Sequence, residues 1–336
     1  METQFKKVLV TGGAGCIGMQ MCSELIQRGI DVCLFDLPEQ IHSVKKNHLK
    51  KATIYYGSIL DRSSLRDAMS GCDAVIHLAA YLGVRRTETN RLRCIEINIE
   101  GTKNVLECSV QQRIKKIIFA SSSEVYGEPL ENPVSENSPT QGKTVYAISK
   151  LAGEELCKAY SQRYPELDFT ILRYFNTYGP YQIAQFVIPK FLRNVMEGKE
   201  PVIYGDGKQI RSFCYASDNA RATVDALIRN EVNGETINIG NSSNPISLIE
   251  LAELVIDVCG KKGLIKPKLE KKFSNTDRTK EREIFERFCD TSKAERMLEF
   301  KPKVTIRKGL ENVVSHGIIQ PKWATTDYAY TLDEWL

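Results

Sequence analysis

The first forty residues hold the feature that most constrains how this chain folds. An apolar segment at 7–10 leads directly into the glycine-rich run T-G-G-A-G-C-I-G at 11–18. A helical pattern follows over 16–28, and a second apolar segment at 31–35 ends at Asp36. Strand, glycine turn and helix in this order predict a βαβ unit with two parallel strands. The free N–H groups at the start of such a helix favour binding of phosphate groups.

The glycines and the acidic residue together indicate a dinucleotide. Gly12 permits the tight turn, Gly15 lets the backbone approach a pyrophosphate, and Gly18 lets the helix pack closely on the sheet. Asp36 can accept hydrogen bonds from both hydroxyls of a ribose and would repel a 2′-phosphate. Because no Lys or Arg follows Asp36 before Lys45, the sequence predicts NAD rather than NADP.

Strand-like and helical segments then alternate as far as residue 180. The strands are expected at 53–56, 74–78, 116–120 and 169–173, and the helices at 63–71 and 91–111. This alternation predicts an α/β fold with a Rossmann-type, doubly wound parallel sheet. Ligands of such a sheet bind beyond the carboxyl ends of the strands, where we expect Gly12, Asp36, His77, 121–124 and Asn176.

The alternation stops after residue 180, where prolines and short polar segments become frequent. We therefore expect an NAD-binding domain over residues 1–180 and a smaller α/β region over residues 181–336 that mainly binds substrate. Segments around 212–240 are expected to return to the first domain, with 236–239 as a strand of its sheet. The aromatic segment 323–336 suggests no role.

Composition excludes several classes of protein. With 42% hydrophobic and 26% charged residues, the 336-residue chain is typical of a soluble globular protein. A net charge of +4 is too small to indicate a nucleic-acid partner. The ten cysteines form no C-x-x-C pair, so we expect free thiols and no metal site. Neither a signal peptide nor a membrane span is evident, and we expect a cytoplasmic protein without a membrane partner.

Tyr146 and Lys150 form a Y-x-x-x-K pair, one helical turn apart. The spacing alone is common on solvent-facing helices, but a dinucleotide site upstream makes redox chemistry on a hydroxyl group the better interpretation. Tyr146 would be the base, although a tyrosine ordinarily titrates near 10. The positive charge of Lys150 favours the phenolate form of its neighbour.

Several motifs occur together in one order. They are T-G-G-A-G-x-I-G at 11–18, H-L-A-A at 77–80, N-x-x-G-T at 98–102, S-S-S-E-V-Y-G at 121–127, Y-x-x-x-K at 146–150, R-Y-F-N-x-Y-G-P at 173–180 and Y-G-D-G at 204–207. Over nearly its whole length the chain resembles the extended short-chain dehydrogenases/reductases of the NAD-dependent epimerase/dehydratase family, which act on nucleotide sugars. The resemblance implies a tightly bound, recycled NAD and a homodimer formed through the helices at 91–111 and 146–164.

The resemblance also implies which residues bind and react. Ser122 would hydrogen-bond the reacting hydroxyl, Tyr146 would act as the base, and Lys150 would also hold the nicotinamide ribose. Ser58 stands where the family has an aspartate that binds adenine, so adenine recognition is expected to be weaker. The implied cofactor contacts are Gly12, Gly15, Cys16, Ile17, Gly18, Asp36, Ser58, Ile59, Leu78, Ala79, Ala80, Tyr146 and Lys150.

The implied substrate is a nucleotide-diphosphate sugar, and a UDP-sugar is favoured. Asn176 and Arg211 correspond to family residues that bind the diphosphate, Tyr204 is expected near the base or its ribose, and Val187 belongs to a segment that resembles the base-binding one. The implied substrate contacts are Ser122, Ser123, Glu124, Tyr146, Asn176, Val187, Tyr204, Arg211 and Arg287.

The reaction itself depends on Glu124. The leading expectation is a 4-epimerase that works through a transient 4-keto sugar. Family decarboxylases and dehydratases have an acidic residue two positions after the catalytic Ser or Thr, where many 4-epimerases have a small residue. Arg287 lies about where decarboxylases have a catalytic arginine, although a structural salt bridge explains it equally well. UDP-glucuronate decarboxylation or 4,6-dehydration is therefore the alternative, and a non-catalytic NAD-binding protein is a second one.

Overall fold

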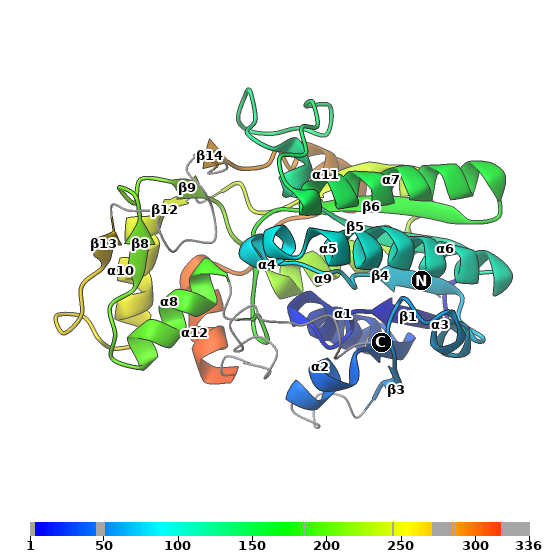
Figure 1. Cartoon of the computed structure of the whole chain (residues 1–336), viewed down its shortest axis with the longest axis horizontal. Coiled ribbons are helices and arrows are strands. Elements are labelled where there is room, and N and C mark those ends of the chain that lie inside the picture. The colour runs from blue at the N-terminus through cyan, green and yellow to red at the C-terminus, as the bar shows by residue number, and fades with distance from the viewer. Residues whose placement is uncertain are drawn as a thin grey trace.

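The centre of the molecule is a parallel sheet of seven strands (Figure 1). The computed structural model describes residues 4–44, 51–183, 186–243, 245–270, 284 and 286–316. The strand order is β11-β6-β5-β4-β1-β2-β3, and all neighbours are parallel. The strands are β1 (Lys7–Thr11), β2 (Asp31–Asp36), β3 (Thr53–Tyr56), β4 (Ala74–His77), β5 (Lys116–Ser122), β6 (Asp168–Tyr174) and β11 (Thr236–Ile239). The predicted doubly wound parallel sheet is confirmed.

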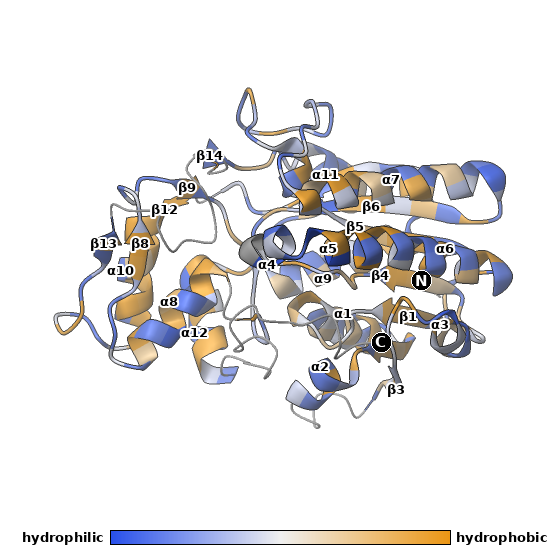
Figure 2. Ribbon diagram, in the orientation of Figure 1, coloured by the Kyte–Doolittle hydropathy of each residue, from blue (hydrophilic) through white to orange (hydrophobic). Residues whose placement is uncertain are grey.

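Helices cover both faces of this sheet. One core lies under α1 (Cys16–Gln27) and α9 (Ala216–Ile228), and the other lies under α3 (Arg62–Met69), α6 (Gly101–Gln111) and α7 (Val145–Arg163). The central strands β4 and β5 are buried along nearly their whole length and have apolar runs, AVI and IIFA, with polar residues at their ends, as expected for strands that are covered on both faces (Figure 2). Two short helices, α2 (Pro38–Ser43) and α4 (Val84–Thr89), follow the ends of strands β2 and β4.

The chain returns to the main sheet after a long excursion. Helix α9 packs beside α1, and β11 then pairs with β6 with Thr236 opposite Ile171. The segment expected at 236–239 is therefore a strand of the main sheet. A later helix, α11 (Ser292–Leu298), packs against β11 and α9, so residues beyond 290 also contact the first domain.

The smaller C-terminal region lies at one end of the main sheet (left in Figure 1). Its helices α8 (Val187–Met196), α10 (Leu248–Val258) and α12 (Ile306–His316) enclose an apolar core of their own. Its short strands are β7 (Thr177–Tyr178), β8 (Val202–Tyr204), β9 (Ile210–Arg211), β10 (Cys214–Tyr215), β12 (Ile246–Ser247), β13 (Lys268–Glu270) and β14 (Glu286–Arg287). The aromatic segment 323–336 lies outside the described residues.

The long helix expected at 91–111 differs from the prediction. It consists of α5 (Arg91–Ile95), a π-helical turn at Glu96–Glu100 and then α6. The wider turn contains Asn98, which is 3% exposed and whose side chain bonds groups outside the helix. A π-helical turn of this kind frequently marks a functional site. Along the described residues, no helix is both long and apolar enough to cross a membrane.

Candidate active site

Two glycines of the loop between β1 and α1 lie so close to other backbone atoms that no side chain would fit there. Gly12 has φ +69°, and a Cβ atom there would lie 2.7 Å from the Ala79 backbone nitrogen. A Cβ atom on Gly18 would lie 2.2 Å from the Gly12 carbonyl oxygen. Gly15 is the N-cap of α1, so the first N–H groups of the helix face the loop. Side chains at Gly12 and Gly18 would collide with backbone atoms, and the free N–H groups at the start of α1 fit the pyrophosphate of NAD.

Asp36 ends β2 beside this loop. Its carboxylate accepts hydrogen bonds from the backbone nitrogens of Ala14 (2.9 Å) and Leu37 (2.8 Å). Burial raises the pKa of Asp36 to about 6, and the two backbone bonds oppose that rise. The carboxylate is held at the end of the strand, where the predicted contact with a ribose requires it.

The remaining predicted cofactor residues follow neighbouring strand ends. Ser58 Oγ accepts a hydrogen bond from Leu60 N (3.2 Å) and keeps its O–H as a donor. Ile59 is 5% exposed and packs on Gly101, so contact with a ligand would be through its backbone. Partly buried positions are occupied by Cys16, Ile17, Leu78, Ala79 and Ala80. Their contacts with NAD stay predictions.

Tyr146 and Lys150 both lie in the first turns of α7. Thr144 caps this helix, since its hydroxyl accepts a hydrogen bond from Ala147 N (3.1 Å). The Lys150 ammonium lies 5.8 Å from the centroid of the Tyr146 ring and donates to the Ala120 carbonyl (2.8 Å). Burial lowers the pKa of Lys150 to about 8. The predicted pair is thus brought together at the carboxyl end of β5.

The environment of Tyr146 sets how readily it ionises. Burial raises its pKa above the ordinary tyrosine value, and the negative charge of Glu124 raises it further. A hydrogen bond with Ser122 acts in the opposite direction. Ser122 ends β5 and also accepts a hydrogen bond from Glu124 N (3.2 Å). Ser122, Glu124 and Tyr146 therefore share one site, as the sequence predicts.

Arg287 reaches the same site from β14. Its Nη2 donates to Glu124 Oε1 (2.6 Å), and its Nη1 donates to the Gly127 carbonyl (3.3 Å). The arginine is 2% exposed. Among the residues that the structure describes, its Nε has no hydrogen-bond partner. A buried N–H group without a partner is costly, and an acceptor on a ligand would satisfy it.

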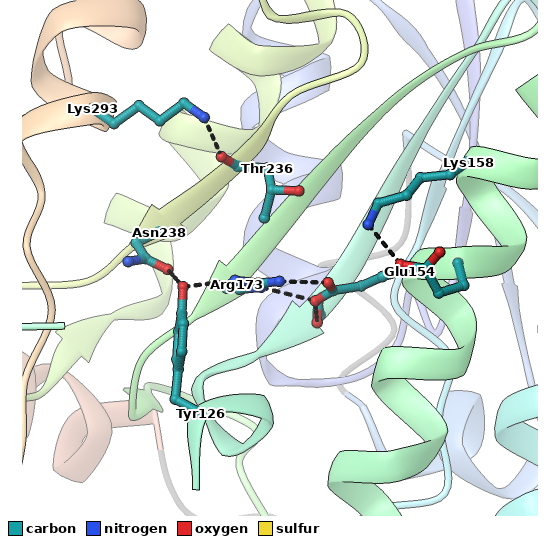
Figure 3. Close-up of polar contacts among 9 residues, drawn as sticks. Tyr126, Glu154, Lys158, Arg173, Thr236, Asn238 and Lys293 are labelled. Carbon is teal, nitrogen blue, oxygen red and sulfur yellow. Dashed lines mark hydrogen bonds and ion pairs between the residues drawn. The ribbon is translucent and has the colours of Figure 1, made fainter. Parts of the chain in front are cut away.

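A second, buried ion pair joins Arg173 and Glu154 (Figure 3). Arg173 at the end of β6 donates to both oxygens of Glu154 on α7, at 2.9 and 2.7 Å. Ser121, the neighbour of Ser122, donates to the same carboxylate at 2.5 Å. Tyr126 continues the network, because its hydroxyl accepts from Arg173 (2.9 Å) and donates to Asn238 (2.7 Å). Sequence reasoning missed this pair, although Glu154 lies one helical turn beyond Lys150.

A neutral histidine links the glycine loop to the π-helical turn. Thr102 Oγ1 donates to the Asn98 carbonyl (2.6 Å), so it accepts from His77 Nε2 (3.1 Å). His77 Nδ1 consequently accepts from Thr11 Oγ1 (2.7 Å). Burial lowers the pKa of His77 to about 3, which keeps the ring neutral. The H-L-A-A and N-x-x-G-T motifs contain these residues, but their partnership is visible only in the structure.

Asn98 completes this link to α7. Its carboxamide accepts from Tyr81 N (2.7 Å) and donates to Tyr81 O (3.0 Å) and Ser149 Oγ (2.9 Å). Ser149 in turn donates to the Tyr146 carbonyl (2.8 Å). The loop after β4 is thereby held against the helix that carries Tyr146 and Lys150.

The remaining predicted substrate residues lie on several elements of the two regions. Asn176 has φ +32°, an unusual value for a residue other than glycine, and its amide donates to Ser212 O (3.0 Å). Arg211 lies on β9 opposite Arg287 on β14. Tyr204 ends β8 and Val187 begins α8, while Ser123 is 3% exposed within the turn after β5. Their contacts with substrate stay predictions.

A phosphate-binding loop and a tyrosine–lysine pair at the same sheet edge define a class of enzyme that oxidises and reduces hydroxyl groups with a bound dinucleotide. Residues 8–240 match the model of the NAD dependent epimerase/dehydratase family. The chain belongs to this family and is an NAD-dependent nucleotide-sugar enzyme.

Three relatives illustrate the range of the family. A UDP-N-acetyl-alpha-D-glucosaminuronate decarboxylase of Bacillus cytotoxicus is 36% identical, over 92% of this chain and 97% of its own. The UDP-glucose 4-epimerase of Thermotoga maritima, solved with UDP-glucose, is 30% identical with a TM-score of 0.82, over 92% of this chain and 98% of its own. The UDP-glucuronic acid 4-epimerase of Bacillus cereus, solved with UDP-glucuronic acid and NAD, has the same identity, score and coverage.

Proposed function

We propose that this enzyme oxidises C4 of a UDP-hexuronate and releases its C6 carboxyl group as carbon dioxide. The observation that carries the proposal is the Glu124–Arg287 pair, with its buried Nε–H lacking a partner in the described structure. A guanidinium group binds carboxylates in a planar, two-point geometry. A uronate carboxylate would supply the acceptor that Arg287 lacks.

The first step is common to the whole family. Tyr146, as the phenolate, takes the proton of the C4 hydroxyl, and Ser122 holds that hydroxyl in place. We assign to the Lys150 ammonium, 5.8 Å from the centroid of the Tyr146 ring, the stabilisation of this phenolate against the burial and the Glu124 charge that raise the pKa of Tyr146. Bound NAD supplies the reversible two-electron oxidation of C4. Because the cofactor is restored in each cycle, we expect it to stay tightly bound.

Oxidation at C4 turns the uronate into a β-keto acid. The C5–C6 bond then breaks, its electron pair moves into an enolate across C4 and C5, and C6 leaves as carbon dioxide. A proton taken up from solvent then adds at C5, and we assign its relay to the Glu124 carboxylate, which accepts it from water and passes it on to C5. Reduction of C4 gives a UDP-pentose, so the overall reaction needs no external oxidant.

A 4-epimerase is the second candidate, and it is the one that the sequence favours. It is supported by the likeness to the UDP-glucuronic acid 4-epimerase of Bacillus cereus. An epimerase must let the 4-keto sugar rotate within the site, so that C4 is reduced from the opposite face. The Glu124–Arg287 pair, 2.6 Å apart, occupies space beside Tyr146 and argues against this second reaction.

The test is NMR spectroscopy of the purified enzyme with UDP-glucuronate and NAD, and with UDP-glucose as the matched neutral substrate. We expect a UDP-pentose and carbon dioxide from the uronate and no decarboxylation product from the glucose. Arg287→Met should abolish the pentose product. A C4 epimer that retains C6 would assign the enzyme to the epimerases instead, and Glu124 would then be only a substrate contact.

We also propose a homodimer formed through α5 and α7. Leu92 and Ile95 on α5 are 63% and 42% exposed, and Ile148 on α7 is 51% exposed. The two helices pack together, and a second copy would cover these apolar side chains, in agreement with the dimer that the resemblance implies. Sedimentation at micromolar concentration should show a dimer for the native chain and a monomer for Leu92→Glu/Ile148→Glu. A native monomer would refute this.

A further inference from the structure

Arg287 is held by a side chain from a distant part of the sequence. Asn132 Nδ2 donates to the Glu286 carbonyl (3.2 Å), and Phe288 N donates to Asn132 Oδ1 (3.3 Å). The two backbone groups flank Arg287 on either side. A carboxamide carries one donor and one acceptor, so Asn132 gives this short strand the two bonds that a neighbouring strand would give.

The segment after Asn132 continues the same pairing with backbone groups. Val134 N donates to Phe288 O (2.9 Å), and Asp290 N donates to Val134 O (2.8 Å). Val134 and Cys289 form a parallel bridge, and both are 0% exposed. Pro133 has no N–H to donate. The side chain of Asn132 therefore continues the pairing on the other side of Pro133, where it bonds the backbone groups that flank Arg287.

This segment is also tied to the helix that carries Tyr146. Val134 O accepts a second hydrogen bond, from Asn238 Nδ2 (3.0 Å). Asn238 accepts from Tyr126, and Tyr126 accepts from Arg173, which is paired with Glu154 on α7 (Figure 3). The backbone that positions Arg287 is thus connected to α7 through buried polar contacts.

We propose that Asn132 is the positioning residue that places Arg287 for recognition of an acidic sugar. The inference rests on the proposed function, because it takes Arg287 as the ligand of the uronate carboxylate. Asn132 does not touch the substrate. It acts by fixing the backbone from which the guanidinium projects toward Glu124, and so it sets the preference for acidic over neutral sugars.

A merely structural role for Asn132 would affect all substrates alike. The measurement is therefore the ratio of two dissociation constants, for UDP-glucuronate and UDP-glucose. It is made by calorimetry on the full-length, NAD-loaded enzyme in a Tyr146→Phe background, where turnover is slow enough for binding to be measured by itself. Asn137 lies in the same loop and is exposed, so Asn137→Ala is the matched control.

We expect Asn132→Ala to weaken binding of UDP-glucuronate about tenfold, the size that corresponds to losing one or two hydrogen bonds. Binding of UDP-glucose should not change, and Asn137→Ala should behave like the parent. In an Arg287→Met background, Asn132→Ala should have no further effect, because the residue through which it acts is absent.

Four results would overturn the inference. Equal weakening of both ligands would make Asn132 a structural residue of the loop. An undiminished effect in the Arg287→Met background would mean that Asn132 acts by another route. If Arg287→Met changes the ratio of the two dissociation constants and Asn132→Ala does not, the role of Asn132 is refuted while the proposed function stands. If Arg287→Met itself leaves the ratio unchanged, the uronate assignment is wrong and the inference falls with it.

Discussion

Removing the charge of Glu154 should destabilise this protein far more than removing the charge of its neighbour. The side chains of Glu154 and Arg173 are 1% and 8% exposed, and two hydrogen bonds join them. Burial alone would lower the pKa of Arg173, but the bonds to Glu154 outweigh it and leave that pKa raised. A guanidinium is not deprotonated at neutral pH even without such a partner, so Arg173 stays charged when the charge of Glu154 is removed.

The structure gives the size of the effect. Breaking a buried pair by removing one partner costs about 3–5 kcal/mol, because an uncompensated charge remains in a medium of low polarity. Glu154→Gln keeps the volume and one acceptor oxygen, so we expect about 3 kcal/mol, the lower end of that range. Total stabilities of protein domains are about 5–15 kcal/mol, so the loss is a large fraction of the whole.

Urea unfolding at a fixed NAD concentration measures this loss. The control is Glu155→Gln, the same substitution one residue along α7. Glu155 pairs with Lys158 at 2.6 Å, but the two side chains are 72% and 46% exposed. An exposed pair of this kind contributes about 0.5 kcal/mol or less. The two variants should therefore differ by about 2.5 kcal/mol.

The reasoning is refuted if both variants lose the same free energy of unfolding, or if Glu154→Gln loses less than about 1 kcal/mol. Either result would mean that water or a rearranged side chain compensates Arg173. We also expect Glu154→Gln to lower turnover, because Ser121 bonds Glu154 and adjoins Ser122.

Three further predictions concern the cofactor and the base. Tyr146→Phe should lower turnover about 10²–10⁴-fold while leaving NAD affinity intact, which steady-state kinetics and a fluorescence titration measure together; normal turnover would exclude Tyr146 as the base. Gly18→Ala should prevent NAD binding, because its Cβ would lie 2.2 Å from the Gly12 carbonyl oxygen; a native dissociation constant would contradict this. Burial raises the pKa of Asp36 to about 6, and its protonated form loses the acceptors for a ribose. NAD affinity should therefore fall as the pH drops through 6, and equal affinities at pH 5 and pH 8 would disprove that role.

Local sequence patterns predicted the sheet and the central part of the site. Gly12 and Gly18 are required by backbone geometry within a few residues, and the Tyr146–Lys150 spacing is fixed by the pitch of one helix. Because parallel strands end at the same edge of a sheet, Asp36 and Ser122 could be placed from the strand pattern alone. These relations hold within one element or between adjacent strands.

The helix at 91–111 shows the limit of such patterns. Its apolar periodicity is helical throughout, and the structure shows a π-helical turn around Asn98, whose side chain bonds Tyr81 and Ser149. Those partners belong to other elements. The local sequence of the helix therefore does not contain the information that interrupts it.

The sequence by itself determined the family, the NAD-binding fold and the placing of Tyr146 and Lys150 one helical turn apart, because each depends on short-range patterns. Only the tertiary structure brought Glu124 to Arg287, 163 residues away, and Asn132 to the backbone on both sides of Arg287. It also paired Glu154 with Arg173 beside Ser121. Contacts between distant segments depend on how whole layers of helices and strands pack. No spacing along the chain specifies them, and the reaction that we propose rests on the contact between Glu124 and Arg287.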